Sequence, residues 1–404
     1  MRAVKAIRDN QLERFCLPQG DADGTRRLAW RRSAVRLQIL LALRRERACE
    51  ELSYLIDHLG RATESTRHRA LAAPEMALYI SALLNETIPD ADIAVPVLAR
   101  VAALSSAPAS QKFSWTGVLP LDYLPLGERI IRVPGGTLNN PELTLNSDQI
   151  RLSSPSDGAT VEVAIRTPGQ PLESCLFRSD RLELVDAWRP FSDLFNDGNL
   201  SLNLDPSSRA AFLTVLDEAV ELIKVVMPAA LEEMVETAQY LSPIRPKDTE
   251  TNALPSFSSP TLPGVIFVGI ERGDGRLIDA RHLAESCVHE HLHNRLYLLD
   301  EALPLTVQTA NPRSYFSPWK QTMRTIEGML HAVYVFSHLA WFWRNVGEKI
   351  NHLAQYADHN VAEQIEHLKI ATAEIDTDEL TPAGRCVLSA STEIIASLTR
   401  ASAT

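Results

Sequence analysis

Apolar residues recur every three or four positions over most of the chain, which is the spacing of helices with one buried face. The pattern is clear from residue 26 to residue 107, and it returns after residue 205. At two points an acidic residue stands where a helix would begin: Asp205 is followed by Pro206, and Asp279 precedes a second apolar pattern. Pro228 is expected to kink or end the helix that starts at Pro206. Helices are therefore predicted over residues 26–47, 48–59, 64–85, 91–107, 206–227, 280–299, 321–346, 350–375 and 382–401.

Between residues 129 and 202 the pattern changes to short alternating or β-branched segments. Residues 130–133, 143–145 and 159–165 are examples, and Pro-Gly and Asn-Asn turns separate them. A further strand is predicted at residues 264–270, after a stretch rich in Pro, Ser and Thr (242–263) that reads as a loop or flap. These strands predict a small, mostly antiparallel sheet.

The elements together indicate a mainly helical α+β protein with helical sections on either side of the small sheet. The expected sections are residues 1–128 (helical), 129–204 (β-rich) and 205–404 (helical, with the strand at 264–270).

Composition and charge exclude several classes of protein. Apolar residues make up 45% and charged residues 23% of the 404 residues, as in a globular chain, and the formal net charge of -11 argues against nucleic-acid binding. The longest strongly apolar run, residues 329–343, is too short for a membrane span and contains two histidines. The first 25 residues lack the apolar core of a secretory signal, and the five cysteines are scattered and odd in number, so a cytoplasmic protein with reduced thiols is expected. Nothing in the sequence indicates an oligomeric state.

Eight arginines between Arg26 and Arg47 are the one local departure from the acidic charge. They lie on or near the polar face of the helix predicted there. Such a face is usually solvated, but it could also capture an acidic partner peptide.

The main chemical signal is the segment His289-Glu290-x-x-His293 inside the helix predicted at 280–299. In a helix these two histidines lie one turn apart on one face, so both imidazoles can reach one divalent metal ion, with Glu290 beside them. Two imidazoles hold a catalytic ion weakly, and a third protein ligand is expected. Nine of the eleven histidines lie between His282 and His367, which places the chemistry in the C-terminal half.

A later predicted helix offers two candidates for the third ligand, Glu327 and His331, four residues apart on one face. Two chemistries fit such a set. In a zinc hydrolase, Glu290 would act as general base toward metal-bound water. In an iron(II) oxygenase, open metal positions would take a 2-oxo acid and dioxygen, and a nearby cation would bind the distal carboxylate of the 2-oxo acid. Arg324, expected on the same helical face, fits that role, with Lys320 as a weaker candidate; Arg324 could equally pair with Glu327.

Residues 262–267, 284–293 and 324–336 resemble the HExxH-motif peptide-modification proteins encoded beside ribosomally made natural-product precursors. The resemblance spans roughly residues 255–345. It implies an Fe(II)- and 2-oxoglutarate-dependent peptide β-hydroxylase, and it favours His331 as third ligand because the Gly-x-Leu-His element, here Gly328 to His331, recurs in that family. Ala332 stands where glycine is usual.

The expected function is therefore β-hydroxylation of a residue in a ribosomal precursor peptide in the cytoplasm. The expected site comprises His289, His293 and His331 as iron ligands, Arg324 and Lys320 for 2-oxoglutarate, and Glu290 as a hydrogen-bonding group. The motif spacing requires a zincin-like helix and excludes the double-stranded β-helix common among 2-oxoglutarate oxygenases. The strand at 264–270 is expected either to pair with the extended peptide or to lie inside the sheet. A zinc metallopeptidase and a non-catalytic scaffold that binds the peptide through the helix at 26–47 are the alternatives.

Overall fold

The computed structural model describes residues 9–47, 49–87, 89–104, 111–116, 118–126, 129–145, 149–156, 158–164, 183–184, 199–202, 204–246, 254–272, 275–310 and 312–401. The chain forms two compact units, each assembled from segments that are separated in sequence. Unit 1 comprises Met1–Ala29, Thr214–Thr237 and Ile278–Thr404, and unit 2 comprises Trp30–Leu213 and Ala238–Leu277. Two helices, α2 (Ala22–Glu46) and α8 (Pro206–Val226), contribute residues to both units.

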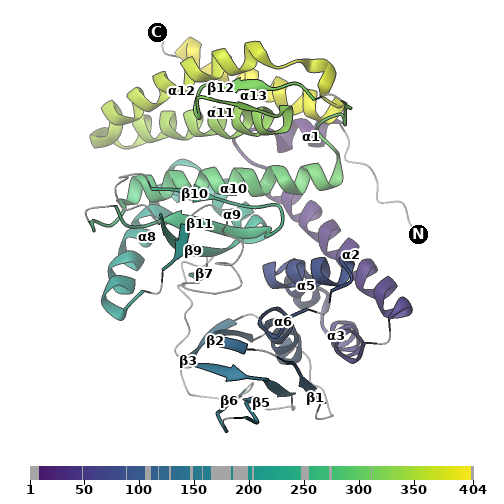
Figure 1. The fold of residues 1–404 in the computed structure, drawn as a ribbon. Coiled ribbons are helices and arrows are strands. Elements are labelled where there is room, and N and C mark those ends of the chain that lie inside the picture. Colours follow the sequence, from purple (N-terminus) through teal and green to yellow (C-terminus); the bar gives the residue numbers. More distant parts are fainter. Residues whose placement is uncertain are drawn as a thin grey trace. The chain divides into compact units, whose positions relative to one another are not determined.

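Unit 1 is mostly helical (Figure 1). The helix α11 (Ile326–Lys349) packs against α12 (Ala354–Glu374) and α13 (Pro382–Ala401). The motif helix α10 (Ala280–Ala302) contacts α11 and also α9 (Pro228–Thr237). The remaining elements are α1 (Asp9–Phe15), the short helices η1 (Asn351–Leu353) and η2 (Thr377–Glu379), and a hairpin of β12 (Tyr315–Ser317) and β13 (Thr322–Arg324). Fully buried aromatic side chains on α11, including Tyr334, Phe342 and Trp343, lie in its core.

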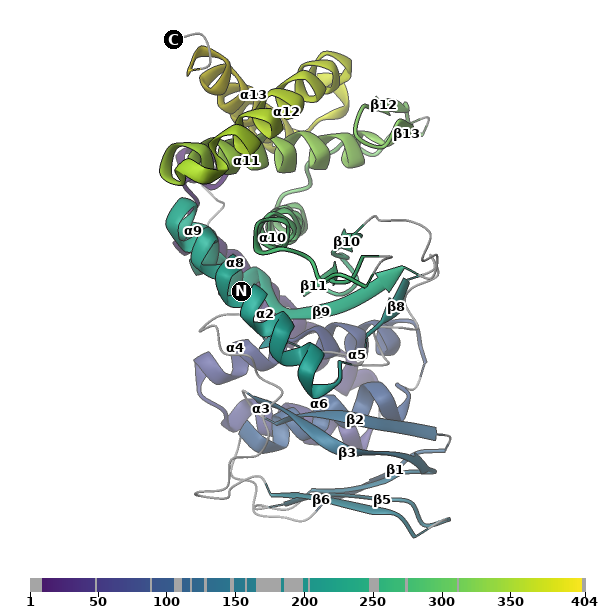
Figure 2. The same cartoon turned by 90° about the vertical axis from the view of Figure 1, so that its left-hand side faces the viewer.

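Unit 2 combines four helices with three sheets. The helices are α3 (Glu50–Arg61), α4 (Glu64–Ala72), α5 (Pro74–Leu84) and α6 (Ala91–Leu104). One antiparallel sheet has the strand order β1 (Gln111–Ser114), β4 (Glu142–Leu145), β5 (Gln149–Ser153) and β6 (Thr160–Ala164). An antiparallel hairpin of β2 (Val118–Leu126) and β3 (Arg129–Asn139) packs against α6 through β2 (Figure 2). The apolar residues of these helices and sheets share one core, in which Leu55, Leu98 and Ile150 are fully buried.

The third sheet has β9 (Ala238–Pro246) at its centre. Its strand order is β10 (Ser256–Phe257), β11 (Gly264–Gly269), β9 and β7 (Glu183–Leu184). In addition, β8 (Asn199–Ser201) pairs with β9. β9 runs parallel to β11 and to β7, whereas the pairs β10–β11 and β8–β9 are antiparallel.

Several helix boundaries follow the chemistry of the residues at the ends. Asp279 caps α10, because its carboxylate accepts a hydrogen bond from the backbone N–H of His282 at 3.1 Å. Asp205 accepts in the same way from the N–H groups of Ser207 and Ser208 ahead of α8. The break between α8 and α9 at Pro228 and the bounds of α13 also agree with the sequence predictions.

Four sequence predictions are wrong in their boundaries. The helix expected over 64–85 is divided into α4 and α5 at Ala73, because Pro74 begins the second helix. β1 and β2 precede Arg129, so strands begin inside the section expected to be helical. The expected loop at 242–263 contains the end of β9 and all of β10, because pairing with β11 buries the apolar residues of β9 despite its prolines. The helix expected from Gln321 starts at Ile326, because Thr325 is its N-cap and accepts from the N–H of Gly328 at 3.2 Å. The β12–β13 hairpin precedes that cap.

β11 is an interior strand. β10 pairs with it on one side and β9 on the other, and all six of its residues are buried. Pairing of a peptide with the strand at 264–270, one of the two roles considered from the sequence, would require β10 to leave, so the internal role applies.

The observed fold is the expected mainly helical α+β class. In the described part of the chain there are twelve α-helices and small sheets that are mostly antiparallel, none of them closed into a barrel. No described helix combines the length and the apolar character needed to cross a bilayer. Among the described residues, Cys16, Cys49, Cys287 and Cys386 form no disulfide, and Cys175 lies outside the described residues.

Gly384, in the first turn of α13, is a position where a side chain should destabilise unit 1. A Cβ atom placed there would overlap the backbone carbonyl oxygen of Leu305, which cannot move independently of its chain. Gly384→Ala should therefore lower the free energy of unfolding by about 1–3 kcal/mol, as overpacking typically does, and the backbone overlap favours the upper end of that range. Thermal unfolding followed by circular dichroism measures the effect.

Gly60 of α3 is the matched control, because a Cβ there meets no atom within 4 Å. Gly60→Ala should leave stability unchanged or raise it by about 0.5–1 kcal/mol, the usual gain from alanine inside a helix. Equal unfolding temperatures for the two variants would contradict the clash at Leu305.

Candidate metal centre

Three histidines from two helices come together in unit 1. His289 and His293 lie one turn apart on α10, and His331 lies in the second turn of α11. Nε2 of His293 is 3.2 Å from Nε2 of His289, and Nδ1 of His293 is 3.2 Å from Nδ1 of His331. The structure therefore joins the two halves of the predicted ligand set, which are 38 residues apart in sequence.

Aromatic rings enclose the three histidines. The ring of Tyr297 lies 5.0 Å from that of His331, and the ring of Phe336 meets His289 edge-on at 5.3 Å. Trp319, at the tip of the β12–β13 hairpin, stacks on Phe336 at 4.4 Å. These residues were not predicted, although Tyr297 follows His293 by four residues and so shares its helical face.

All three imidazoles are neutral near physiological pH. Burial lowers the pKa of His331 to about 4. Burial, with a smaller effect of Lys320, lowers the pKa of His289 to about 4. The pKa of His293 falls well below its usual value, first through burial and then through the neighbouring imidazoles, Arg324 and Lys320. Neutral imidazoles keep the lone pairs that bind a metal ion.

The donor types fit a divalent metal, but the present ring orientations do not yet form a coordination site. Two nitrogens bound to one ion at about 2.1 Å are about 3.0–3.4 Å apart, and the observed nitrogen pairs have that spacing. However, His293 turns one ring nitrogen to His289 and the other to His331. Among the described residues, no group of three or more His, Cys, Asp or Glu side chains is arranged to hold an ion. At least one imidazole must rotate before all three can share one metal.

Glu290 is buried next to the histidines, with 1% of its surface exposed. One carboxylate oxygen, Oε1, lies 3.9 Å from Nε2 of His289. The negative charge of Glu290 also contributes to the raised pKa values of Cys287 and Tyr297, although burial is the larger cause for both groups. A buried carboxylate at this position can accept a hydrogen bond from a group bound beside the histidines.

The two predicted cations lie on the hairpin rather than on α11. Lys320 is in the turn between β12 and β13, and Arg324 is the last residue of β13, so Arg324 does not share a helical face with His331 as expected from the sequence. Both are exposed, and both lie close enough to lower the pKa of His293. The stem of Arg324 runs beside Gly328, where an added Cβ would lie 3.7 Å from Cβ and Cδ of the arginine. Within the described residues, neither cation forms an ion pair, and no hydrogen bond or ion pair joins Arg324 to Glu327.

Glu327 and His331 differ in their surroundings. Glu327 is exposed in the first turn of α11, whereas His331 is only 6% exposed and directly faces His293. Of the two candidates for third ligand, His331 is the one that lies among the other histidines.

His338, two turns beyond His331, is a buried core residue as expected. Its Nδ1 lies 2.7 Å from the carbonyl oxygen of Tyr334, and burial lowers its pKa to about 3. It makes no contact with the three clustered histidines among the described residues.

Several arginines of α2 have partners within the protein. Arg44 pairs with Asp57 at 2.8 Å, Arg26 with Asp23 at 3.1 Å, and Arg36 is buried and donates to the carbonyl oxygen of Leu71. These contacts engage part of the arginine-rich face within the protein, whereas the alternatives considered from the sequence were a solvated face and peptide capture.

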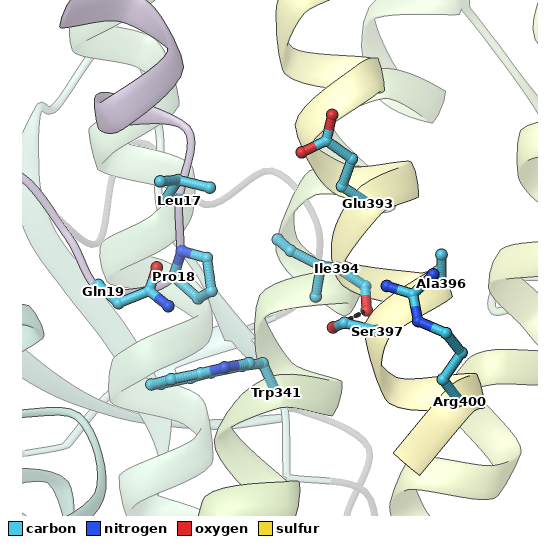
Figure 3. A pocket seen from close by; sticks show the side chains of 9 residues that line it. All are labelled: Leu17, Pro18, Gln19, Trp341, Glu393, Ile394, Ala396, Ser397 and Arg400. Carbon is cyan, nitrogen blue, oxygen red and sulfur yellow. Dashed lines mark hydrogen bonds between the residues drawn. The ribbon is translucent and has the colours of Figure 1, made fainter. Parts of the chain in front are cut away.

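A separate pocket of about 470 Å³ lies in unit 1, and its lining residues come from the segment 17–19 and from α11 and α13. Figure 3 shows Pro18, Trp341 and Ile394 facing the hollow, with Glu393 and Arg400 on the same side of α13. None of the clustered histidines lines it, so it is distinct from the candidate metal centre.

The low pKa values of the buried histidines predict that stability falls with pH. Between about pH 6.5 and pH 3, His338 takes up a proton in the unfolded chain but stays neutral in the folded protein. The free energy of unfolding should therefore decrease as pH falls through this window, by about 1.4 kcal/mol per pH unit for each such histidine. Urea unfolding at several pH values measures the slope.

His338→Asn keeps a donor for the carbonyl of Tyr334 but removes the titrating group. Its stability should depend less steeply on pH than that of the wild type. An identical slope in both proteins would show that His338 does not contribute.

In comparisons with known proteins, the chain matches no protein-family model and no curated protein.

Proposed function

We propose that the protein is an Fe(II)- and 2-oxoglutarate-dependent hydroxylase that acts on a ribosomally made precursor peptide. The observation that carries the proposal is the cluster of three neutral imidazoles, one buried (His331) and two partly buried (His289 and His293), beside two exposed cations, Lys320 and Arg324. A zinc site alone has no need of the cations, whereas a 2-oxo acid brings a distal carboxylate that needs one.

His289, His293 and His331 would hold the iron, which supplies the activation of dioxygen coupled to decarboxylation of the 2-oxo acid. Arg324 is assigned to the distal carboxylate, because a guanidinium binds a carboxylate through two parallel hydrogen bonds. Lys320, in the same hairpin, adds a second positive charge near the bound 2-oxo acid. The rings of Tyr297 and Phe336 pack against His331 and His289, and Trp319 stacks on Phe336, so they would shield one side of a substrate bound there from water.

Glu290 is assigned a positioning role within this proposal. A hydroxylation at an unactivated carbon offers no acidic proton for a carboxylate to remove. Its buried oxygen, 3.9 Å from His289, is placed to accept a hydrogen bond from a bound water molecule or from a peptide N–H. The cysteines of the described residues form no disulfide, which agrees with the reducing cytoplasm in which such peptides are made.

A zinc-dependent metallopeptidase is the second candidate, and the position of Glu290 favours it. A buried carboxylate next to the histidine pair is also where a general base would take a proton from metal-bound water. A non-catalytic scaffold, the third reading, would bind the peptide without needing the histidines.

One assay separates the three. Protein loaded anaerobically with Fe(II) is mixed with 2-oxoglutarate, dioxygen and a precursor peptide encoded beside its gene, and the products are analysed by mass spectrometry. Hydroxylation gives an intact peptide heavier by one oxygen atom, with one succinate and one carbon dioxide per peptide. Cleaved peptide in the presence of zinc alone would support the peptidase instead. Peptide binding that survives chelation and His289→Ala would support the scaffold.

A further inference from the structure

Two pairs of residues lie on opposite faces of α10. His289 and His293 face His331 of α11, while His291 and Arg295, which have the same four-residue spacing, face Glu233 of α9. Residues two apart in a helix point about 200° away from each other. One face of α10 thus meets His331 of α11, and the opposite face meets the buried carboxylate of Glu233 on α9.

Glu233 is the centre of this second contact, and none of its side chain is exposed. Its Oε2 lies 3.2 Å from Nε2 of His291, and its Oε1 lies 3.4 Å from Nη2 of Arg295. Thr237, one turn later on α9, has its hydroxyl 2.6 Å from Nδ1 of His291. A neutral ring that donates to the carboxylate from Nε2 accepts at Nδ1, so both edges of His291 are engaged by α9.

The carboxylate and the guanidinium are both charged. Burial alone would raise the pKa of Glu233, but Arg295 and His291 lower it to about 2. Arg295 also donates to the carbonyl of Phe15, and its guanidinium lies 4.3 Å from the centre of the Phe15 ring. Loss of either charge would leave the other buried without a partner.

The N-terminal segment completes the shell around Glu233. Oε1 accepts hydrogen bonds from the backbone N–H of Asp21 at 2.6 Å and from the hydroxyl of Thr25 at 3.2 Å. The chain passes so close because Gly20 has a positive φ of 76° and no side chain: a Cβ there would lie 2.8 Å from Cβ of Ala229 and 3.1 Å from Oε1 of Glu233. Segments from three parts of the sequence therefore meet at one carboxylate.

We propose that Glu233 is a positioning residue for the candidate metal centre: by holding His291 and Arg295, it fixes the rotation of α10 and so directs His289 and His293 toward His331. The inference rests on the proposed function in one respect, since it requires that the three histidines bind a metal. Glu233 itself touches none of the three ligands among its described contacts and acts through the helix.

Co(II) titration of the full chain tests the proposal, because Co(II) reports its ligand geometry through its visible absorption spectrum. Glu233→Gln preserves the size of the side chain but removes its charge. We expect its Kd for Co(II) to rise by about tenfold, as for other groups that orient metal ligands from behind, and its spectrum to change. The unfolding temperature of the same variant should also fall.

Leu398→Ala is the control for destabilisation without misdirected ligands. Leu398 is a core residue of α13 with 3% of its surface exposed, and it contributes nothing to the contacts of Glu233. The unfolding temperature of this variant should also fall, but its Kd for Co(II) and its spectrum should equal those of the wild type. A purely structural role of Glu233 predicts that the two variants behave alike.

Thr237→Val is a milder second variant, in case Glu233→Gln does not fold. It removes only the hydroxyl that contacts His291 and should raise the Kd for Co(II) a few-fold, with a smaller spectral change. Wild-type Kd and spectrum in every folded variant, together with normal Co(II) binding by the wild type, would overturn the role of Glu233 alone. A wild-type protein that binds no Co(II) would overturn the metal centre and this inference together.

Discussion

His331→Ala should abolish tight metal binding, whereas Glu327→Ala should leave it nearly unchanged. His331 is buried, and its Nδ1 lies 3.2 Å from Nδ1 of His293. Its removal therefore reduces the donor set from three imidazoles to two. Two ligands hold a divalent ion far less firmly than three, and the Kd for Fe(II) should rise by about 100-fold or more. Glu327 is exposed and contacts none of the histidines in the described structure, so its loss removes no donor.

Metal content after anaerobic loading and desalting measures this difference. The His331 variant should retain only a small fraction of an equivalent of iron, and hydroxylation and succinate formation should be lost with it. The Glu327 variant should retain about one equivalent. Full occupancy in the histidine variant, with loss in the glutamate variant, would reverse the assignment of the third ligand.

Arg324→Gln should weaken the use of 2-oxoglutarate with little effect on folding or on metal content. The side chain is exposed, so its replacement removes no core contact. A hydrogen bond between charged groups contributes about 1.5–3 kcal/mol, and about 1.4 kcal/mol corresponds to a factor of ten, so KM for 2-oxoglutarate should rise roughly 10- to 100-fold. Lys320→Gln should have a smaller effect in the same direction.

Succinate formation as a function of 2-oxoglutarate concentration gives these values. Arg313→Gln is the matched control, since Arg313 is a nearby exposed arginine that is bonded to Asp376. It should leave KM unchanged. If Arg324→Gln and Arg313→Gln gave the same KM as the wild type, the carboxylate would have to be bound elsewhere.

Local signals were enough to predict the elements that carry the histidines. The apolar period of α10, the cap at Asp279 and the four-residue spacing of His289 and His293 are all properties of one short segment. The position of His331 in a later helix followed from a second such segment. These segments alone left Glu327 and His331 as alternatives for the third ligand, and the family resemblance favoured His331. The ring orientations depend on packing that no local pattern encodes.

The surroundings of the histidines were harder to predict because they depend on contacts between distant segments. Glu233 is an ordinary acidic residue of an amphipathic helix until the fold brings it to His291 and Arg295. Cys16 and Cys386 are likewise scattered in sequence, yet their side chains hydrogen-bond to each other, and this contact together with burial raises the pKa of Cys16.

The hairpin before α11 was missed for a different reason. Thr325 is a good N-cap residue, and recognising it would have placed the start of the helix at Ile326. The periodic residues on its C-terminal side were instead extended backward to Gln321. This error changed the element that carries Arg324 but not its proximity to His293.

The cap at Thr325 also divides two regions that differ in how many substitutions their structure tolerates. The three clustered histidines lie on long helices whose neighbours are mostly buried, where few substitutions are tolerated. The three residues of β13 are all exposed, and the hairpin ends before the helix begins, so its charge and length can vary without disturbing the helical hydrogen bonds that follow. Substitutions, insertions and deletions in the hairpin are therefore expected to leave the imidazole cluster in place.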